Sequence, residues 1–415
     1  MIRNKKRILC IVPTYYPASK FGGPIQALRS LNYFLTKNNF EIEVVTTNAG
    51  LEDRSEYKLN KNIKKLDGIK TIYFSRIKFF DFFNSSGWHF SIPLFIYVLQ
   101  NAKNFDVIYC RSIWNFPTIA AYIASKIYNK KLIIAATGKL TPWVWSQMTI
   151  KKNIYWRFIA RRIVQHSSIH YVSKEEEELC HKFHQFKNTP MIIKTGTDKI
   201  ISTNREINDD YKFNENDNEV NKLLFMGRIH HMKGIDTLID VYKDLIKNGK
   251  TVCLIIAGPK DGDYFEKINL ILKENNLDYL NLSPKEFHKK SIKNKIVFTG
   301  LVEGNDKNWL YENADIYCHF SRNEGFSNSI IEAMAFKKPI IISEGCYFND
   351  AKNSDFGDVY SQKDDATKKL MQLIDNNVLR EKMGANAQKY ILEHHDWEKI
   401  SKKAAIEINK FIINS

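Results

Sequence analysis

Apolar and polar positions alternate along this chain in two rhythms. Short apolar runs indicate buried strands, and the longer segments between them indicate helices. In the first half, strands are predicted at residues 7–12, 42–46, 71–75, 107–110, 132–135 and 168–172, and helices at 24–37, 92–103, 118–128, 153–166 and 174–184. Strands and helices that alternate at this interval predict a parallel sheet with right-handed crossovers.

The second half repeats this alternation, which predicts a second parallel sheet. Strands are predicted at residues 222–226, 252–257, 295–299, 316–320 and 340–343, and a set of helices at 365–415 contains Trp397 as an anchor. Residues 203–221 are polar and poor in aliphatic side chains, which is typical of a connection between domains. We therefore expect an α/β protein with two doubly wound, Rossmann-like domains: residues 1–200, a linker at 201–221, and residues 222–396.

Length and composition are those of an ordinary globular protein. With 415 residues, 44% of them hydrophobic and 26% charged, the chain can bury cores in two or three domains. The six cysteines lie singly, which argues against a disulfide scaffold or zinc ribbon and indicates a reducing compartment. The apolar run at residues 8–12 is too short for a signal peptide, and residues 92–99 contain Pro93 and are too few to span a bilayer. A cytoplasmic protein is expected.

Positive charge is concentrated in the first half of the chain. The net charge is +16, and residues 1–200 carry 31 Lys and Arg against 13 Asp and Glu, whereas residues 201–415 carry 31 against 33. No acidic residue occurs between Asp106 and Glu175, a stretch with 11 Lys or Arg. Four of the seven tryptophans lie in the same stretch: Trp114, Trp143, Trp145 and Trp156. We expect the N-terminal half to meet a negatively charged partner.

The most informative chemistry lies in residues 321–335, SRNEGFSNSIIEAMA, where Glu324 and Glu332 are eight positions apart. A predicted strand precedes this segment, and Asn328 or Ser329 can cap the helix that follows. One carboxylate thus lies in the loop after a strand and the other in the first turns of a helix, where open parallel sheets bind small ligands. Two acids can accept hydrogen bonds from the hydroxyls of a sugar or ribose, and a helix start favours phosphate. The alternative is two solvated glutamates that flank a helix.

Two further loops carry chemistry that suits phosphates. Gly227 and Arg228 follow a predicted strand, and Lys233 comes just before the next helix; Arg offers a diphosphate a forked contact and Lys a point charge. Gly22 and Gly23 allow the backbone to approach a ligand closely, although a Gly pair is common in loops. The alternatives are a solvated basic turn and an ordinary loop.

These segments resemble the signatures of the retaining family-four glycosyltransferases, enzymes of the two-domain GT-B fold. The resemblance rests on EGFSNSIIEAMAFKKP, LLFMGRIHHMKGIDTLI, IVPTYYPASKFGGPIQALRSL, and AATGKLTPWVW followed by IHYVSKEEEEL, so it covers nearly the whole chain. It implies two Rossmann-like domains that face a central cleft, with a last helix, within residues 397–415, that returns to the N-terminal domain. It also implies a hexosyltransferase that takes a UDP- or GDP-linked sugar as donor and needs no cofactor.

The same resemblance implies roles for single residues. Glu332 would hold the ribose hydroxyls and Glu324 the sugar hydroxyls, while Arg228 and Lys233 would stabilise the departing diphosphate. Glu324, Arg228 and Lys233 are thus the expected catalytic residues, and in a front-side attack the leaving phosphate itself takes the acceptor's proton. The expected donor-binding residues are Gly22, Gly23, Thr137, Gly227, Arg228, Lys233, Glu324, Gly325, Phe326, Ser327, Asn328 and Glu332.

Two positions depart from the family pattern. Many members have a histidine against the donor sugar where Thr137 stands, and Thr195 stands where an Asn-Gly pair is usual. These departures leave open which sugar is transferred, and they leave open a catalytically inactive relative that binds nucleotide sugars. A nucleic-acid-binding protein is a second alternative, suggested by charge alone, because the sequence has no recognised motif for it.

No metal is expected. Asp261 and Asp263 imitate an Asp-x-Asp metal signature, but they follow a strand in a turn where Asp and Gly are ordinary. Cys180, His181 and His184 lack a fourth ligand and are interpreted as structural.

The acceptor is expected to be a saccharide, best explained as one linked to a polyprenyl diphosphate during assembly of a bacterial surface polysaccharide (O-antigen, capsule or exopolysaccharide). A predicted helix carries the cations Lys151, Lys152, Arg157, Arg161 and Arg162 among the apolar residues Ile150, Ile154, Tyr155, Trp156 and Phe158. Such a helix suits an anionic lipid interface, so the protein is expected at the inner face of the plasma membrane. Residues 76–83, RIKFFDFF, are a second candidate. The alternative is a solvated helix face whose apolar positions lie in the core.

Overall fold

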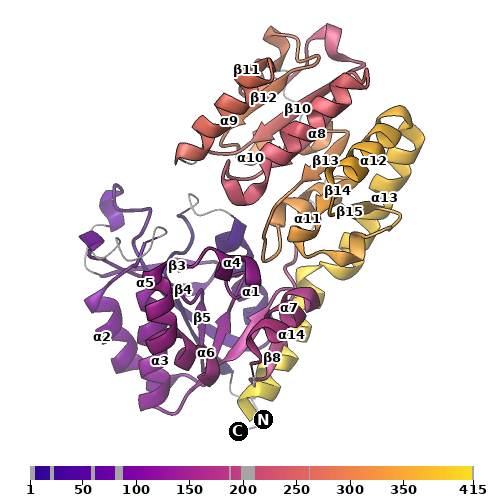
Figure 1. The fold of residues 1–415 in the computed structure, drawn as a ribbon. Coiled ribbons are helices and arrows are strands. Elements are labelled where there is room, and N and C mark those ends of the chain that lie inside the picture. Colours follow the sequence, from indigo (N-terminus) through magenta and orange to yellow (C-terminus); the bar gives the residue numbers. More distant parts are fainter. Residues whose placement is uncertain are drawn as a thin grey trace. The chain divides into compact units, whose positions relative to one another are not determined.

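The computed structural model describes residues 5–18, 23–57, 61–79, 87–186, 188–197, 211–260 and 262–413. The chain divides into two compact units, each built around one sheet (Figure 1). Unit 1 comprises Met1–Gly196 and Trp397–Ser415, and unit 2 comprises Thr197–Asp396.

The sheet of unit 1 has eight strands in the order β3-β4-β2-β1-β5-β6-β7-β8. All neighbours run parallel except β3 and β4. The strands are β1 Lys6–Val12, β2 Phe40–Thr47, β3 Lys61–Leu66, β4 Ile69–Phe74, β5 Val107–Arg111, β6 Lys131–Ala135, β7 Ser168–Tyr171 and β8 Pro190–Ile192. The sequence patterns predicted all of these except the two outermost strands. β3 is Lys-rich and partly exposed and β8 has three residues, so neither carries the apolar run of a central strand.

Helices cover both faces of this sheet. They are α1 Gly23–Lys37, α2 Ile92–Asn101, α3 Phe116–Ile127, α4 Pro142–Ser146, α5 Ile150–Tyr155, α6 Arg161–His166, α7 Lys174–His184 and α14 Trp397–Ile413. One π-helical turn, Trp156–Ala160, joins α5 to α6, so the helix predicted at 153–166 starts at Ile150.

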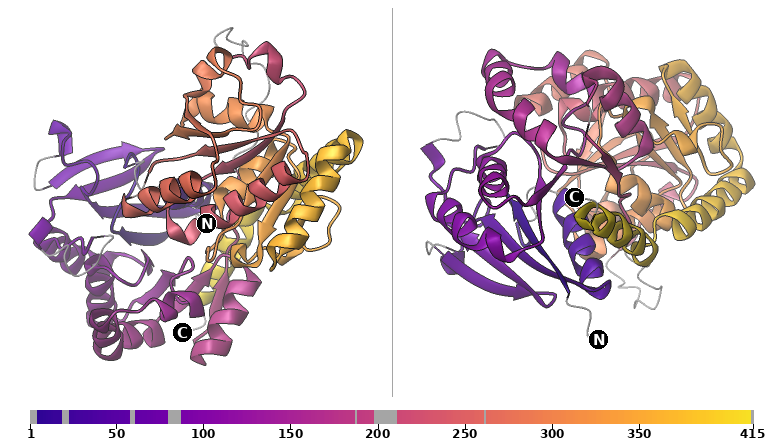
Figure 2. Two further views of the ribbon diagram at one scale, coloured as in Figure 1. Left: turned by 45° about the horizontal axis from the view of Figure 1, so that its top comes forward. Right: turned by 90° about the horizontal axis from the view of Figure 1, so that it is seen from below.

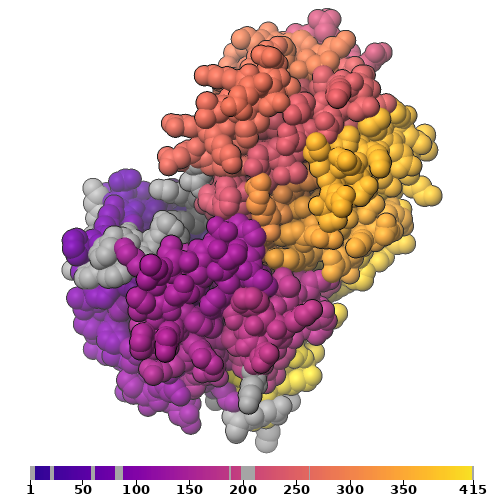
Figure 3. Space-filling view, viewed as in Figure 1, coloured from indigo at the N-terminus to yellow at the C-terminus, as the bar shows by residue number. Residues whose placement is uncertain are grey.

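The core of unit 1 has two layers. Apolar residues of α2, α3 and α6 pack on one face of the sheet, and those of α1 and α14 pack on the other. Trp397, 4% exposed, stacks on Phe34 with ring centroids 6.5 Å apart, and Asn38 Nδ2 donates to Ser401 Oγ (3.0 Å). The last helix therefore lies beside the first, as the right panel of Figure 2 shows, and its yellow surface adjoins the magenta part of unit 1 in Figure 3.

The sheet of unit 2 has seven parallel strands in the order β11-β12-β10-β9-β13-β14-β15. They are β9 Asn221–Met226, β10 Val252–Ala257, β11 Tyr279–Asn281, β12 Ile296–Gly300, β13 Ile316–His319, β14 Ile340–Ser343 and β15 Gly357–Tyr360. The five central strands were predicted, because strands buried on both faces form continuous apolar runs. The short outer strands β11 and β15 were not.

Helices also cover both faces of the second sheet. They are α8 Ile235–Lys247, α9 Gly262–Glu274, α10 Gly304–Asn313, α11 Asn328–Ala335, α12 Lys363–Asp375 and α13 Asn377–His394. Residues of α8, α9 and α12 pack on one face, and those of α10, α11 and α13 on the other. Among the described residues, no helix is long and apolar enough to cross a membrane.

Residues 211–220, which fall in the segment expected to connect the domains, pack within unit 2. Phe213 lies against the core, and the buried carboxylate of Asp217 accepts hydrogen bonds from Ser291 Oγ (2.6 Å) and Ile292 N (3.0 Å).

Each sheet has one point where the strand order reverses. In unit 1 the first strand, β1, lies between β2 and β5, and in unit 2 β9 lies between β10 and β13. Ligands of open parallel sheets bind outside the carboxyl ends of the strands at such points. The candidate residues are therefore sought in the loops that leave these strands.

Candidate active site

The loop that follows β9 carries Lys233 in a turn that requires glycine. The short helix His231–Lys233 ends at Gly234, whose φ of 62° lies in the left-handed region. A Cβ at Gly234 would lie 2.0 Å from the Phe320 carbonyl oxygen, so a larger residue cannot fit. This close approach brings Lys233 against the loop that follows β13.

The loop after β13 is fastened to its neighbours on two sides. Arg322 N donates to Met232 O (2.8 Å), and the Arg322 guanidinium donates to both carboxylate oxygens of Asp236, at 2.8 Å each. On the other side, Glu324 N donates to Gly345 O (2.8 Å), just beyond β14. Glu324 is thus held in place where the carboxyl ends of β9, β13 and β14 meet.

Glu324 is the centre of a buried charged cluster. Its Oε1 pairs with Lys233 Nζ and contacts His319 Nε2 at 3.0 Å. Tyr317 OH lies 3.0 Å from His319 Nδ1. Because a carboxylate only accepts, the imidazole donates through Nε2, which leaves Nδ1 to accept from Tyr317. The side chains of Lys233, His319 and Glu324 are 14%, 0% and 9% exposed, so water screens the cluster little.

This cluster fixes the charge of Glu324. Burial by itself would raise the pKa of the carboxyl, but Lys233 and the hydrogen bond from His319 outweigh burial and hold the pKa well below its usual range. Burial lowers the pKa of His319, so its ring is neutral at pH 7. Glu324 is therefore a fixed acceptor of hydrogen bonds and cannot donate a proton.

Glu332 has different surroundings. Its Oε1 accepts from Lys307 Nζ and its Oε2 from Tyr311 OH, both at 2.9 Å and both from α10. The Glu332 side chain is 30% exposed. The second acid is therefore oriented by one helix at the surface, whereas Glu324 is held inside the cluster.

Helix α11, which carries Glu332, starts one residue earlier than expected. The residue before α11 is Ser327, not Asn328 or Ser329 as predicted, and its side chain makes no capping hydrogen bond. Ser327 Oγ lies 2.9 Å from Ser329 Oγ, which in turn lies 2.6 Å from Tyr317 OH. These hydroxyls connect the first turn of α11, where Asn328 is the first residue, to the cluster around Glu324.

The other expected donor-binding residues of unit 2 differ in exposure. Arg228 is exposed at the end of β9, and Gly227 N beside it donates to Ala257 O (2.9 Å). Gly325 is half-buried, and the ring of Phe326 packs against Phe348 and His395. Phe326 therefore anchors the loop to the core.

Three of the expected residues belong to unit 1. Gly23 is the first residue of α1, whereas Gly22 lies outside the described residues. Thr137 has a φ of 46° in the loop after β6, and the next residue, Gly138, donates its N–H to Glu176 Oε1 (2.5 Å). Gly23 and Thr137 therefore follow strands β1 and β6, at the carboxyl ends of the first sheet.

Sequence analysis missed four residues of this site. His319 and Tyr317 lie within β13 as ordinary strand residues, and nothing in the pattern singles them out. Lys307 and Tyr311 are four positions apart, a spacing that puts both on one face of a helix, but that helix was not predicted. Their partnership with Glu332 depends on how two helices pack.

Within the described parts of the chain, no group of three or more His, Cys, Asp and Glu side chains could hold a metal ion. Cys180 is a buried thiol, and His184 Nε2 lies 2.8 Å from the Leu140 carbonyl oxygen, which accepts its hydrogen bond. Asp261 lies outside the described residues.

Known proteins are similar to this chain over both units. The family model described as "Glycosyl transferases group 1" matches residues 206–390. The chain is 26% identical over 311 residues to the uncharacterized glycosyltransferase MJ1069 of Methanocaldococcus jannaschii, an alignment that covers 72% of this chain and 74% of that protein. It is 27% identical over 197 residues to the capsular polysaccharide biosynthesis glycosyltransferase CapM of Staphylococcus aureus, which covers 47% of each.

A solved structure shares the architecture. The crystal structure of Anabaena Alr3699/HepE in complex with UDP and glucose superposes with a TM-score of 0.69 and 17% sequence identity, covering 98% of this chain and 100% of that one. This likeness confirms the predicted GT-B fold, with two parallel α/β sheets. The chain is therefore a glycosyltransferase of the GT-B fold, and residues 206–390 match the model of the group 1 glycosyl transferases.

Proposed function

We propose that this protein is a retaining hexosyltransferase that moves a sugar from a nucleotide-diphosphate sugar to a saccharide acceptor. The observation that supports this most directly is the buried cluster in which Lys233 and His319 hold Glu324 ionised. Glu324 accepts hydrogen bonds from the sugar hydroxyls, and Glu332 accepts them from the ribose. Gly325, Ser327 and Asn328 place backbone N–H groups around the donor's phosphates. Gly227 lies beside Arg228 at the end of β9, and Phe326 holds the loop in position.

Stabilisation of the leaving group carries the chemistry. The bond between the sugar's anomeric carbon and the phosphate oxygen breaks, and its electron pair stays on the diphosphate. The acceptor hydroxyl attacks from the same face, forms the new bond, and gives its proton to the departing phosphate oxygen. Arg228 and Lys233 offset the charge that develops on the diphosphate, and the N-terminus of α11 adds its dipole. An ammonium has three donors, so Lys233 can keep Glu324 while it binds a phosphate oxygen.

The donor is a UDP- or GDP-linked sugar. HepE, with a similar fold, was crystallised with UDP and glucose, which makes UDP-glucose the first donor to test. Thermal unfolding with a panel of UDP- and GDP-sugars should show one that raises the melting temperature, and release of the same nucleotide should follow when acceptor-bearing membranes are added. No shift with any donor would contradict the proposal. A shift without turnover would favour a nucleotide-sugar-binding protein that has lost activity.

Metal-independence follows from the same cations. Arg228 and Lys233 take the place that a divalent metal has in Asp-x-Asp enzymes, so turnover should persist in EDTA. Complete loss that a metal restores would contradict this assignment and point to Asp263 and its neighbours.

The acceptor is a lipid-linked saccharide of a surface polysaccharide, met at the inner face of the plasma membrane. The similarity to CapM supports the pathway. The helical run from α5 to α6 supports the membrane: Ile150, Ile154 and Phe158 are 79%, 55% and 57% exposed at a spacing of four residues, which aligns them on one side. The cations along this run are Lys151, Arg157, Arg161 and Arg162, all exposed, and Lys152, half-buried.

Two aromatic residues expected at this surface point the other way. Tyr155 OH donates to Ile113 O (3.0 Å), and the Trp156 ring packs on Trp145 at 4.6 Å, so both belong to the core of unit 1. The second candidate segment is described up to Phe79, which is 75% exposed, but Arg76 there is paired with Glu52 (2.7 Å). The membrane surface therefore consists of the aliphatic and phenyl side chains between the exposed cations of α5 and α6.

Liposome flotation tests this surface. The protein should float with anionic vesicles at low salt and be released at high salt, at about 1 kcal/mol for each cation near the surface. Arg161→Glu/Arg162→Glu should reduce flotation strongly, whereas Lys402→Glu/Lys403→Glu, an equal charge change on α14 of the same unit, should not. Equal flotation of both double variants would contradict the membrane surface and leave the transferase proposal intact.

A further inference from the structure

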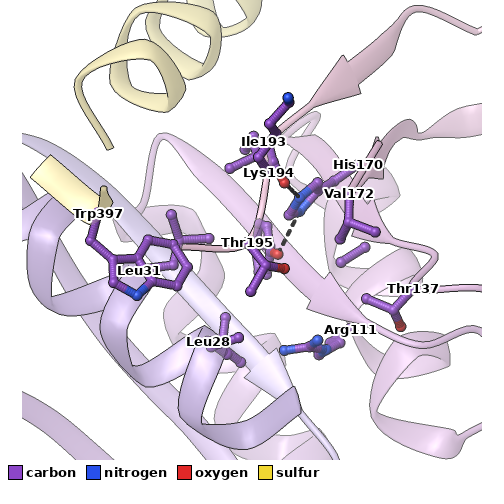
Figure 4. A pocket seen from close by; sticks show the side chains of 13 residues that line it. Leu28, Leu31, Arg111, Thr137, His170, Val172, Ile193, Lys194, Thr195 and Trp397 are labelled. Carbon is purple, nitrogen blue, oxygen red and sulfur yellow. Dashed lines mark hydrogen bonds between the residues drawn. The ribbon is translucent and has the colours of Figure 1, made fainter. Parts of the chain in front are cut away.

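A hollow in unit 1 lies at the carboxyl ends of its central strands. It measures about 290 Å³, including the space that opens to solvent. The residues that line it come from α1, from the ends of β5, β6 and β7, from the segment after β8, and from the start of α14. Figure 4 shows Leu28 and Arg111 on one side of this hollow, with Thr137 and Thr195 nearby. Its lining includes Arg111 and Lys194 but no acidic residue. The hollow is therefore suited to an anionic group.

Arg111 is a cation without a carboxylate partner among the described residues. Its Nη1 donates to the Pro24 carbonyl oxygen in the first turn of α1. No carboxylate in the described parts of the chain lies within 4.0 Å of this guanidinium, which has five N–H donors. Burial lowers the pKa of Arg111, because desolvation disfavours the charged form of the guanidinium. A cation in this situation gains free energy when an anion binds.

The nearest acid cannot serve as that anion. The Glu176 carboxylate favours the charged form of Arg111, but its two oxygens accept from Gly138 N (2.5 Å) and Val172 N (2.9 Å). These bonds keep Glu176 behind the loop that carries Thr137. Among the described residues no acid balances Arg111, so an anion that binds from outside can do so.

The buried histidine of the hollow, His170, is held in a fixed, neutral state. His170 Nε2 donates to the Ile193 carbonyl oxygen (2.9 Å), and Tyr109 OH lies 2.8 Å from His170 Nδ1. Burial lowers the pKa of His170 to about 4, so the ring is uncharged at pH 7 and both nitrogens are engaged. In addition, α1 begins beside Arg111 with no acidic residue in its first turn, so the positive end of the helix dipole favours an anion there.

We infer that this hollow is a second phosphate-binding site, in which the Arg111 guanidinium binds a phosphate group of one of the two substrates. This rests on the proposed function, because the phosphate comes either from the diphosphate of a lipid-linked acceptor or from the diphosphate of the donor. The chemistry is shared: a forked guanidinium on two phosphate oxygens, with the start of α1 behind it.

Inorganic pyrophosphate tests the site without turnover. The double variant Arg228→Ala/Lys233→Ala, first shown by circular dichroism to be folded, removes the two cations that the proposed function assigns to the diphosphate. Pyrophosphate should still bind to it in calorimetric titration. Adding Arg111→Gln should weaken this binding roughly tenfold or more, since a charge-assisted forked contact is lost. Adding Arg54→Gln, which removes an exposed cation of the same unit, should change nothing. Absence of binding to the double variant, or equal binding with and without Arg111→Gln, would overturn the site.

Two further measurements keep the result interpretable. Arg111→Lys retains the charge without the fork and should bind pyrophosphate with intermediate affinity, which covers the case in which Arg111→Gln does not fold. In the otherwise unaltered protein, a loss of UDP affinity on Arg111→Gln assigns the phosphate to the donor, and unchanged UDP affinity with a raised KM for the acceptor assigns it to the acceptor. Because pyrophosphate binding needs no turnover, failure of the transferase proposal would show separately, as the absence of product with every donor.

Discussion

Each unit buries a glutamate at the carboxyl edge of its sheet, and the two differ in charge: Glu176 is shifted toward its neutral form, whereas Glu324 is held ionised. Glu176 of unit 1 is 0% exposed and Glu324 of unit 2 is 8% exposed. Glu176 is held by two backbone N–H groups, and burial raises its pKa to about 7 despite them. Glu324 touches Lys233 and His319, and its pKa is held well below the usual range although burial opposes this. Burial alone drives a carboxyl toward its neutral form, and a cation in contact reverses the outcome.

The comparison also separates two kinds of site. In unit 2 the cation and the acid balance each other before any ligand arrives, so a ligand meets a preorganised charged cluster. In unit 1 the acid is tied to the backbone and Arg111 has no carboxylate partner among the described residues, so the balancing charge has to arrive with the ligand.

The largest difference between the two glutamates should disappear when the cation beside Glu324 is removed. Lys233→Ala leaves a buried carboxylate with His319 as its remaining side-chain partner, so the free energy of unfolding should fall by about 3–5 kcal/mol. Turnover should fall roughly 100-fold or more, because Lys233 also faces the departing diphosphate in the proposed reaction. Denaturant titration and steady-state kinetics measure the two effects.

A double variant separates the two roles of Lys233. Lys233→Ala/Glu324→Gln removes the uncompensated charge together with the cation, so it should regain most of the stability and none of the turnover. Equal stability losses in the single and double variants would contradict the idea that Glu324 depends on its cation.

Glu324→Gln alone should keep the fold and lower turnover by roughly 100-fold, while donor affinity changes little. The amide keeps the shape of the side chain, but it is a weaker acceptor for sugar hydroxyls and no longer balances Lys233. Dividing kcat/KM of the parent by kcat/KM of the variant gives the loss of transition-state stabilisation. A large rise in KM with unchanged kcat would instead make Glu324 a ground-state binding residue.

Glu332→Ala should weaken donor binding by tens-fold and affect turnover less. Its hydrogen bonds to the ribose are charge-assisted, at about 1.5–3 kcal/mol each. Lys307→Ala is the matched control: it removes a cation from Glu332 but leaves the carboxylate and Tyr311 in place, so calorimetric titration with UDP or GDP should show a smaller loss. Equal effects of the two variants would mean that Glu332 acts through Lys307.

Glu176→Gln should change how the free energy of unfolding depends on pH. The folded-state pKa of Glu176, about 7, lies above its ordinary value of 4.5, so the folded protein holds more protons between these values. Stability contributed by the protonated form is therefore full below pH 4.5 and declines as pH rises to 7, by up to about 3 kcal/mol. Urea titrations from pH 5 to pH 8 should show this decline in the parent, and Glu176→Gln should flatten it. An unchanged slope would place the titration elsewhere.

The sequence predicted much of the fold because central strands and covering helices carry their own patterns. Every predicted strand of both sheets is present, from residues 7–12 to residues 340–343. The outer strands β3, β8, β11 and β15 escaped prediction, since an edge strand needs neither length nor an apolar run. The spacing of Glu324 and Glu332 likewise placed one acid in a loop and the other in a helix, as the structure has them.

What the sequence by itself determined is which residue types stand at the ends of which strands, because local patterns record strand, turn and helix. The state of those residues was decided by tertiary packing. Lys233 reaches Glu324 because Gly234 lets two loops touch, and Lys307 reaches Glu332 because α10 packs beside α11. Charge and pKa depend on what lies within a few ångströms, and such neighbours come from strands and helices far apart in the chain.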